Sequence, residues 1–191
     1  MLIGTFDAAT FALDEDGLRK RVLAWMRPEE ADRVIAAFRA NRPAATPSER
    51  FFAIATAVSF RKGAWTHAGL KAARNAASVY LYELDWQTQV DGGKWQSPHS
   101  LDLALVFDNV AKSASMVGSG PEAQKMADQM SGAWLAFART GDPSTPGLPW
   151  PSWRPDSRAT MVFNTESEAV NRYRDDERTL LANMATKGPF D

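Results

Sequence analysis

The sequence predicts an α/β protein, because a strand with two apolar faces is surrounded by segments that have helical periodicity. Residues 78–86, S-V-Y-L-Y-E-L-D-W, are β-branched or aromatic and place apolar side chains on both faces. Such a strand is typical of a sheet covered by helices on two sides. Residues 31–38 and 122–139 are candidate helices, since their apolar residues recur with the spacing of one helix face. We therefore expect helices layered on a sheet.

The composition is that of an ordinary globular protein, and it excludes several classes of partner. The 191 residues are 45% hydrophobic with a formal net charge of -1, which predicts one domain over residues 1–191 with a sizeable core. Because 22 basic residues oppose 23 acidic ones without a basic cluster, we expect no nucleic-acid partner. No apolar run approaches the ~20 residues that cross a bilayer, so we expect no membrane span. Cysteine is absent, the two histidines lie far apart and no phosphate-binding glycine loop follows a strand, so we expect neither a metal nor a cofactor.

The first half of the chain is expected to form a strand end followed by three helices. Residues 2–5 resemble the end of a buried strand and the turn out of it, and a chain that begins inside a strand is typical of a fragment. Residues 14–17 read as a solvated turn, and helical spacing follows over residues 18–26. A new helix should begin at Pro28, which suits the first turn of a helix. Thr46 and Glu49 have the spacing of a capping box, so a long helix should begin there.

The second half is expected to add one long helix, a strand and a terminal helix. The helix over 122–139 should end at Gly141 and bury one side, formed by Met126, Met130, Trp134, Leu135 and Phe137. Residues 142–155, rich in Pro, Gly and Trp, should form an ordered extended loop, because buried tryptophans do not accompany disorder. Residues 159–164 read as a short strand, and residues 175–184 as a charged helix.

The candidate for chemistry is His99, in the segment from Trp95 to Asn109. Pro98 disfavours helix before it, so His99 should lie in a loop beyond the end of the predicted strand, where catalytic groups collect in open α/β sheets. Ser100 is expected to cap a following helix, with Asp102 in its first turn. Asp102 either acts on His99 electrostatically or only favours the helix N-terminus, and the second interpretation needs fewer assumptions.

No serine in the chain is a convincing nucleophile. A G-x-S-x-G sequence is absent, and the nearest segment, Val117 to Gly120, has only adjacent glycines. Neighbouring carboxylates such as Asp14 with Asp16 lie in polar runs typical of a solvated surface. From the residues alone, His99 is a catalytic candidate without a visible nucleophile, and the function stays open.

A family resemblance adds to this reading. Residues 97–109, S-P-H-S-L-D-L-A-L-V-F-D-N, resemble the histidine motif of the type-B carboxylesterases, which are serine hydrolases of the α/β-hydrolase fold. Four further blocks resemble the family in the same order: 79–86, 118–143, 150–155 and 158–163. The helix after the histidine departs from the family's Pro, Phe and Gly at Ala104, Leu105 and Asp108. The resemblance covers nearly the whole chain but only the family's C-terminal portion, which implies the C-terminal part of an α/β-hydrolase fold, helix-rich with two or three strands.

The resemblance also implies roles for individual residues. His99 would be the general base and acid of a Ser-His-acid triad, with the serine and the oxyanion-hole loop both upstream of Met1. The family's acid follows a strand in a segment similar to residues 2–10, where its glutamate position falls on Ala8. Asp7 is the only nearby carboxylate and is therefore the candidate acid. The implied substrate is a small-molecule carboxylic ester, hydrolysed only when upstream chain completes the site, because loss of a triad nucleophile costs on the order of 10⁶ in kcat.

Three hypotheses follow. The first is the C-terminal portion of a carboxylesterase, inactive by itself. The second is a non-catalytic remnant or interaction module, which Ala8 at the acid position favours. The third is a partly folded fragment whose open sheet edge and apolar surface lead to self-association. The sequence leaves the ester, the compartment and the oligomeric state open.

Overall fold

In a computed structural model, residues 8–184 are described, and their contacts form two compact units. The first unit contains residues 8–67 and 174–184, and the second contains residues 68–173. The predicted strand end at residues 2–5 lies outside the described residues. The single domain predicted for the chain stays a prediction, and each unit is presented by itself.

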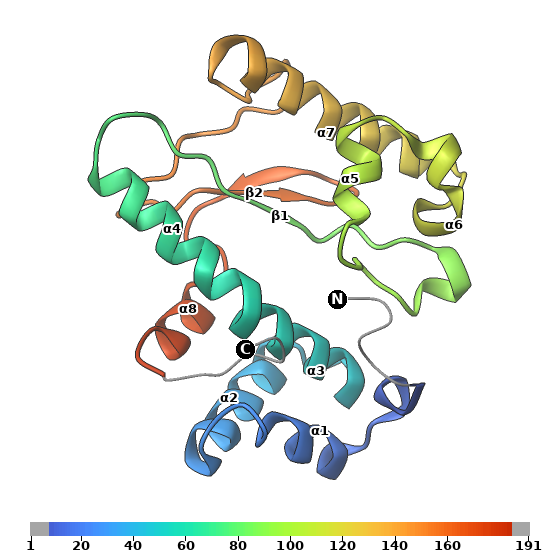
Figure 1. Cartoon of the computed structure of the whole chain (residues 1–191), viewed down its shortest axis with the longest axis vertical. Coiled ribbons are helices and arrows are strands. Elements are labelled where there is room, and N and C mark those ends of the chain that lie inside the picture. Colours follow the sequence, from blue (N-terminus) through green and yellow to red (C-terminus); the bar gives the residue numbers. More distant parts are fainter. Residues whose placement is uncertain (1–7, 185–191) are drawn as a thin grey trace. The chain divides into compact units, whose positions relative to one another are not determined.

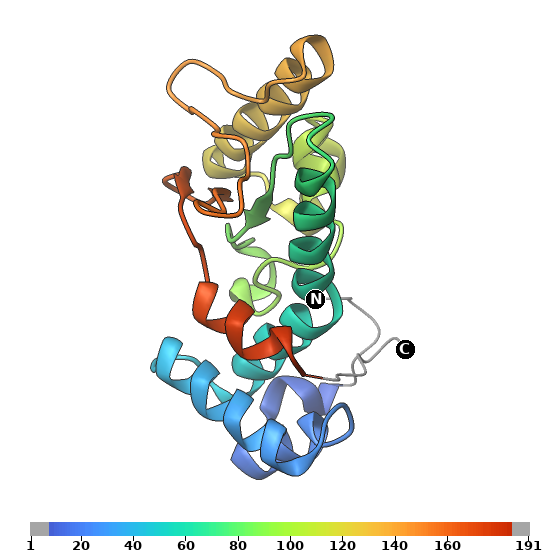
Figure 2. The ribbon, with the colours of Figure 1, turned by 90° about the vertical axis from the view of Figure 1, so that its left-hand side faces the viewer.

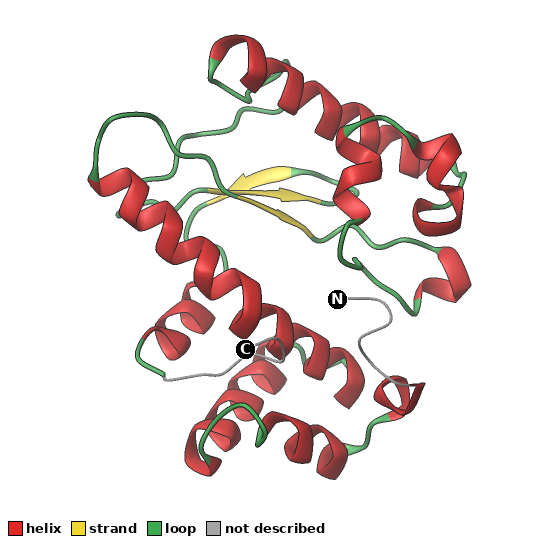
Figure 3. Ribbon diagram, viewed as in Figure 1, coloured by secondary structure: helices red, strands yellow, loops and turns green. Residues whose placement is uncertain are grey.

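The described part of the first unit is helical (Figures 1 and 3). Its elements are η1 (Ala8–Ala12), α1 (Glu15–Val22), α2 (Pro28–Asn41), α3 (Pro47–Thr56), the π-helical turn η2 (Ala57–Arg61), the start of α4 (Lys62–Ala73) and α8 (Asp175–Ala182). Figure 2 shows α8 beside α2, with which it is in contact. Apolar faces of α1, α2, α3 and α8 form its core, with Leu18, Val34, Phe38, Ile54 and Leu181 fully buried.

Helix starts in this unit follow the predicted capping signals. Pro28 is the first residue of α2, as expected. The Thr46 hydroxyl accepts a hydrogen bond from the Glu49 backbone N–H at 3.2 Å, and Glu49 Oε2 accepts one from the Thr46 backbone N–H at 2.6 Å. The predicted capping box is therefore confirmed. The helix expected over residues 18–26 begins earlier, at Glu15, because Asp14 caps it through its side chain. It also ends earlier, at Val22, because the chain turns before Pro28 and cannot continue the helix into it.

The second unit combines a three-stranded sheet with helices (Figure 3). Its elements are the end of α4, β1 (Tyr82–Leu84), η3 (Val90–Gly93), α5 (Leu101–Val106), η4 (Val110–Ser113), α6 (Ala114–Val117), α7 (Pro121–Thr140), β2 (Thr160–Phe163) and β3 (Glu168–Val170). The strand order is β1-β2-β3. β1 runs parallel to β2 with Tyr82 opposite Met161, and β3 runs antiparallel to β2. The α/β prediction is confirmed, with strand β2 and helix α8 close to where the sequence places them.

The strand expected over residues 78–86 pairs over a shorter length than predicted. Only Tyr82–Leu84 forms the ladder, because its partner β2 has just four residues. Ahead of the ladder, the chain is already extended: the carbonyl oxygens of Val79 and Leu81 accept hydrogen bonds from Trp153 N and Met161 N. The β1 residues are half-buried rather than covered on both faces, since β1 is an edge strand of the described sheet.

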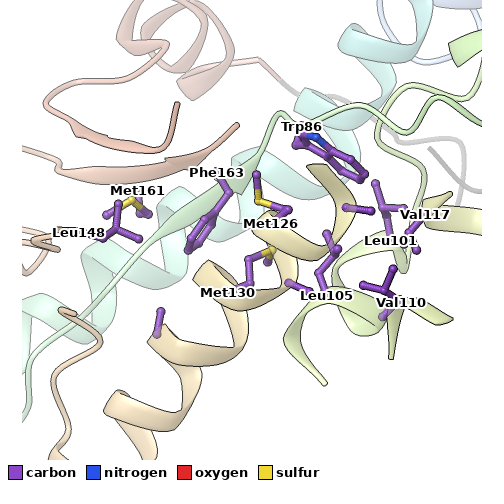
Figure 4. Packing of buried hydrophobic residues seen from close by; sticks show 14 of the residues in the cluster. Trp86, Leu101, Leu105, Val110, Val117, Met126, Met130, Leu148, Met161 and Phe163 are labelled. Atoms are coloured by element: carbon purple, nitrogen blue, oxygen red, sulfur yellow. The ribbon is translucent and has the colours of Figure 1, made fainter. Parts of the chain in front are cut away.

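Helix α7 packs on α5 and the sheet through one stripe of side chains. Figure 4 shows Met126 and Met130 of α7 facing Phe163 of β2 together with Leu101 and Leu105 of α5. Gly141 ends α7 in the left-handed conformation, as predicted. Leu135 and Phe137 were expected on the buried side, but their side chains are 54% and 48% exposed. The buried stripe of α7 consists of residues that recur every three or four positions: Ala123, Met126, Met130 and Ala133. Leu135 and Phe137 lie outside this stripe.

The loop between α7 and β2 is ordered by its tryptophans, as predicted. Trp150 and Trp153 are both buried. Trp150 packs edge-on against Phe163 and Tyr82, at centroid distances of 5.5 and 6.4 Å. The loop therefore closes the aromatic core of the second unit rather than connecting two elements loosely.

Candidate active site

His99 lies on an exposed turn between two buried neighbours. After β1, the chain runs through the loop containing η3 and returns to α5 beside α7 (Figure 1). Pro98 is buried, His99 is exposed, and Leu101, the first residue of α5, is fully buried. The expectation of a loop histidine just ahead of a helix is confirmed, and apolar contacts on both sides determine where the turn lies.

The prediction that the Ser100 side chain caps α5 is wrong. Ser100 occupies the N-cap position of α5, but its side chain makes no capping hydrogen bond. Its backbone is left-handed, with φ of 70°, whereas a side-chain cap of this type needs an extended backbone at that position. A non-glycine residue in this conformation is strained and is held there by its surroundings. The strain lies in the residue immediately after His99.

Two polar contacts tie the turn to the strand that precedes it. On the N-terminal side, the Ser97 hydroxyl donates a hydrogen bond to the carbonyl oxygen of Trp86. On the C-terminal side, the Tyr82 hydroxyl donates to Asp102 Oδ2 at 2.8 Å. Asp102 is thus a partner of β1 as well as a carboxylate in the first turn of α5, where it suits the helix dipole.

The contact of Tyr82 with Asp102 cannot be predicted from the sequence pattern. The pattern predicts a strand at Tyr82, but nothing in it links this residue to a carboxylate 20 residues further along the chain. One physical signal was present: a tyrosine in a half-buried strand needs a hydrogen-bond partner for its hydroxyl. The motif after His99 supplies that partner.

The other predicted site residues are distributed as follows. Asp7, the candidate acid, lies outside the described residues. Ala8, where the resemblance places the family's glutamate, is exposed at the start of η1. Ser119 lies between helices α6 and α7 rather than between a strand and a helix, which agrees with its rejection as a nucleophile. Over residues 8–184, no three His, Cys, Asp or Glu side chains cluster as metal ligands, and no helix has the length and apolar character to span a membrane.

The chain is similar to known esterases over most of its length. The carboxylesterase family matches residues 14–181. The para-nitrobenzyl esterase of Bacillus subtilis is 28% identical over 107 residues, which are 55% of this chain and 22% of that protein. The phenmedipham hydrolase of Pseudarthrobacter oxydans is 27% identical over 177 residues, covering 88% of this chain and 35% of that protein.

Solved structures agree in fold. A carboxylesterase of Geobacillus stearothermophilus superposes with a TM-score of 0.74 at 31% identity, over 91% of this chain and 36% of that one. The structure titled "THERMOPHYLIC PNB ESTERASE" gives a TM-score of 0.65 at 24% identity, over 88% of this chain and 34% of that one. The chain thus spans about a third or less of the length of these relatives. The chain has the fold of the C-terminal part of an α/β-hydrolase domain, as in its structural neighbours, and it belongs to the carboxylesterase family.

Proposed function

We propose that this chain is the C-terminal portion of a carboxylesterase domain and supplies His99 to a Ser-His-acid triad that hydrolyses carboxylic esters. Both compact units belong to this one domain in the proposal. The observation that carries it is the position of His99: exposed on a strained, doubly anchored turn that follows a parallel strand, inside a segment that matches the family. In α/β sheets the catalytic groups lie beyond the C-terminal ends of such strands.

The proposed chemistry follows from the imidazole. One ring nitrogen of His99 accepts the proton of the serine hydroxyl as its oxygen attacks the ester carbonyl, and the imidazolium then donates that proton to the leaving alcohol. A water molecule, deprotonated in the same way, then attacks the acyl–serine ester, and the imidazolium returns the proton to the serine oxygen as the acid product leaves. Asp7 is the proposed group that orients the imidazole. Asp102 is not assigned to the triad, because it lies in the first turn of the helix that follows His99, where its carboxylate suits the helix N-terminus.

The nucleophile is not in this chain, so the isolated chain is expected to be inactive. Loss of the serine from a triad lowers kcat by about 10⁶. The test is a chimera in which this chain replaces the matching C-terminal third of the Geobacillus stearothermophilus carboxylesterase, assayed with p-nitrophenyl butyrate beside the chain alone. We expect hydrolysis by the chimera and none by the chain.

Two variants of the chimera decide the role of His99. His99→Ala should lower kcat by about 10⁴ or more. The control, His67→Ala, replaces the other histidine, an exposed residue of α4, and should retain activity. Hydrolysis that survives His99→Ala contradicts the assignment. A chimera that folds, as judged by circular dichroism and gel filtration, yet hydrolyses no ester favours the non-catalytic remnant that Ala8 suggests.

A further inference from the structure

The hydrogen bond between Tyr82 and Asp102 connects the strand before the His99 turn with the helix after it. Tyr82 is in β1, and Asp102 is in the first turn of α5, three residues after His99. The two oxygens are 2.8 Å apart. A hydrogen bond to an ionised carboxylate is about twice as strong as one between neutral groups. This contact therefore restrains the first turn of α5 relative to β1.

The tyrosine itself is held rigidly by aromatic neighbours. Its ring lies edge-on to Trp134, Phe163 and Trp150, with centroid distances of 5.0, 6.1 and 6.4 Å. Such edge-to-face pairs have specific geometry, so the ring orientation and the place of the hydroxyl are both restricted. Burial raises the pKa of the Tyr82 phenol far above its usual range, and the charge of Asp102 and the hydrogen bond raise it further. The hydroxyl thus remains a donor throughout the neutral range.

The N-terminal side of the turn has a matching restraint. Besides the contact between Ser97 and Trp86, the Thr88 backbone N–H donates to the Gln96 carbonyl oxygen at 3.0 Å. The turn is tied at both ends, and Ser100 between them is kept in the left-handed conformation. Apolar packing of Leu101 on α7 also holds the C-terminal end, but the polar restraint there is a single side-chain pair, which makes it open to a specific test.

We propose that Tyr82 and Asp102 form a positioning pair that holds the first turn of α5 and thereby fixes the direction in which His99 presents its imidazole. This inference rests on the proposed function, because orientation has a catalytic meaning only if His99 acts in the triad. Neither residue touches the substrate in this proposal. Asp102 acts through the helix, and Tyr82 acts through Asp102.

The test uses the isolated chain and needs no enzymatic activity. Tyr82→Phe removes one oxygen and keeps the ring and its aromatic contacts. We expect the imidazole signals of His99 in nitrogen–proton NMR spectra to shift in the native state, and the amide exchange of Leu103 and Leu105 to accelerate about tenfold. The signals of His67, in the other unit, should stay in place. The matched control is Tyr80→Phe, because Tyr80 also packs edge-on against Trp150 but shows no hydrogen bond from its hydroxyl among the described contacts.

A second pair of variants separates positioning from general stability. Asp102→Asn should shift the His99 signals in the same way, and Asp102→Glu, which keeps the charged acceptor, should restore them. All spectra are recorded below the unfolding transition, where a change in stability alone leaves native-state signals in place. Native His99 signals that coincide with those of the unaltered chain in both Tyr82→Phe and Asp102→Asn overturn the proposal.

The same substitutions in the esterase chimera connect the pair to catalysis. Tyr82→Phe should lower kcat about tenfold with an unchanged KM, and Tyr80→Phe should leave both constants unchanged. An inactive but folded parent chimera refutes the proposed function and, with it, the catalytic meaning of the pair. An active chimera whose kcat is insensitive to Tyr82→Phe refutes the positioning role alone.

Discussion

Each unit adds a different polar contact to the apolar packing of one helix. In the first unit, helix α8 packs through Leu181 and also contains a buried ion cluster: the side chain of Glu177 is only 1% exposed and lies 2.5 Å from Arg42 Nη1 and 3.1 Å from Arg61 Nη1, with Arg174 at 3.7 Å. In the second unit, helix α5 is fixed by apolar packing on α7 and by the hydroxyl of Tyr82.

This difference determines how each unit responds to substitution. A buried ion cluster is stable only when every member is present, because one missing carboxylate leaves buried cations without compensation. Aromatic and aliphatic packing is distributed over many contacts, so a conservative change costs less. The candidate site belongs to the unit with distributed packing. Single substitutions around His99 are therefore expected to leave the fold intact and to report on chemistry.

The largest expected effect is in the first unit, at Glu177. Glu177→Gln keeps the shape of the side chain but removes the charge that compensates Arg42 and Arg61, both largely buried. We expect the free energy of unfolding to fall by about 3 to 5 kcal/mol, measured by urea denaturation. The control is Asp32→Asn, which breaks an exposed ion pair with Arg19 and should leave the unfolding midpoint unchanged. If Glu177→Gln and Asp32→Asn both change the free energy of unfolding only slightly, the first unit is not more sensitive to substitution than the second.

A smaller effect is expected from a conservative change in the aromatic core of the second unit. Phe163 is fully buried and contacts Tyr82, Trp134 and Trp150. Phe163→Leu keeps an apolar side chain but loses these ring contacts, so we expect a loss of about 1 to 2 kcal/mol in the free energy of unfolding. Phe107→Leu is the matched control, since Phe107 is 69% exposed, and it should have no measurable effect. A loss of unfolding free energy as large as that of Glu177→Gln would show that the second unit tolerates substitution no better than the first.

Helix starts allow a third comparison between the units. Thr46→Ala removes the confirmed cap of α3 and should cost about 1 kcal/mol in the free energy of unfolding. Ser100→Ala, at the start of α5, removes no capping hydrogen bond and should leave the unfolding midpoint in place. Both variants are measured by thermal and urea denaturation. A clear loss in Ser100→Ala would mean that its hydroxyl supports α5 after all.

Local signals in the sequence were sufficient for several helices. Proline, the capping box and apolar spacing place α2, α3, α7 and α8, because each signal acts within a few residues of the element that it marks. The histidine turn was also predictable, since Pro98 lies directly before it. The family resemblance then gave the turn its chemical interpretation.

Features that depend on distant partners were not predictable in this way. The length of β1 is determined by β2, which lies far along the chain. Leu135 and Phe137 belong to an apolar helix, and only the tertiary contacts of α7 decide which stripe is buried. Ser100 has the residue type of a cap, but the anchors on each side of the turn impose a left-handed backbone instead. The pair of Tyr82 and Asp102 likewise exists only once β1 and α5 are in place.

The smallest expected effect is a pH dependence in the first unit, centred on Glu15. Its carboxylate accepts hydrogen bonds from Arg50 and Arg39 at 2.7 and 2.6 Å. The hydrogen bond from Arg50, supported by that from Arg39 and by both charges, lowers the pKa of the Glu15 carboxyl, although burial acts in the opposite direction. A pKa that is lower in the folded state means a contribution to stability that is present above the unfolded value of about 4.5 and is lost as the pH falls through the folded value.

Glu15→Gln should therefore lower the urea midpoint slightly at neutral pH and by progressively less as the pH falls below about 4.5. The effect is small because Glu15 is half exposed and solvent screens its charge. Glu168→Gln, which replaces an exposed carboxylate on β3, serves as the control and should leave the urea midpoint in place. A Glu15→Gln difference that stays constant down to low pH would show that packing rather than charge connects α1 with α3, and the two units would then be stabilised more similarly than their contacts indicate.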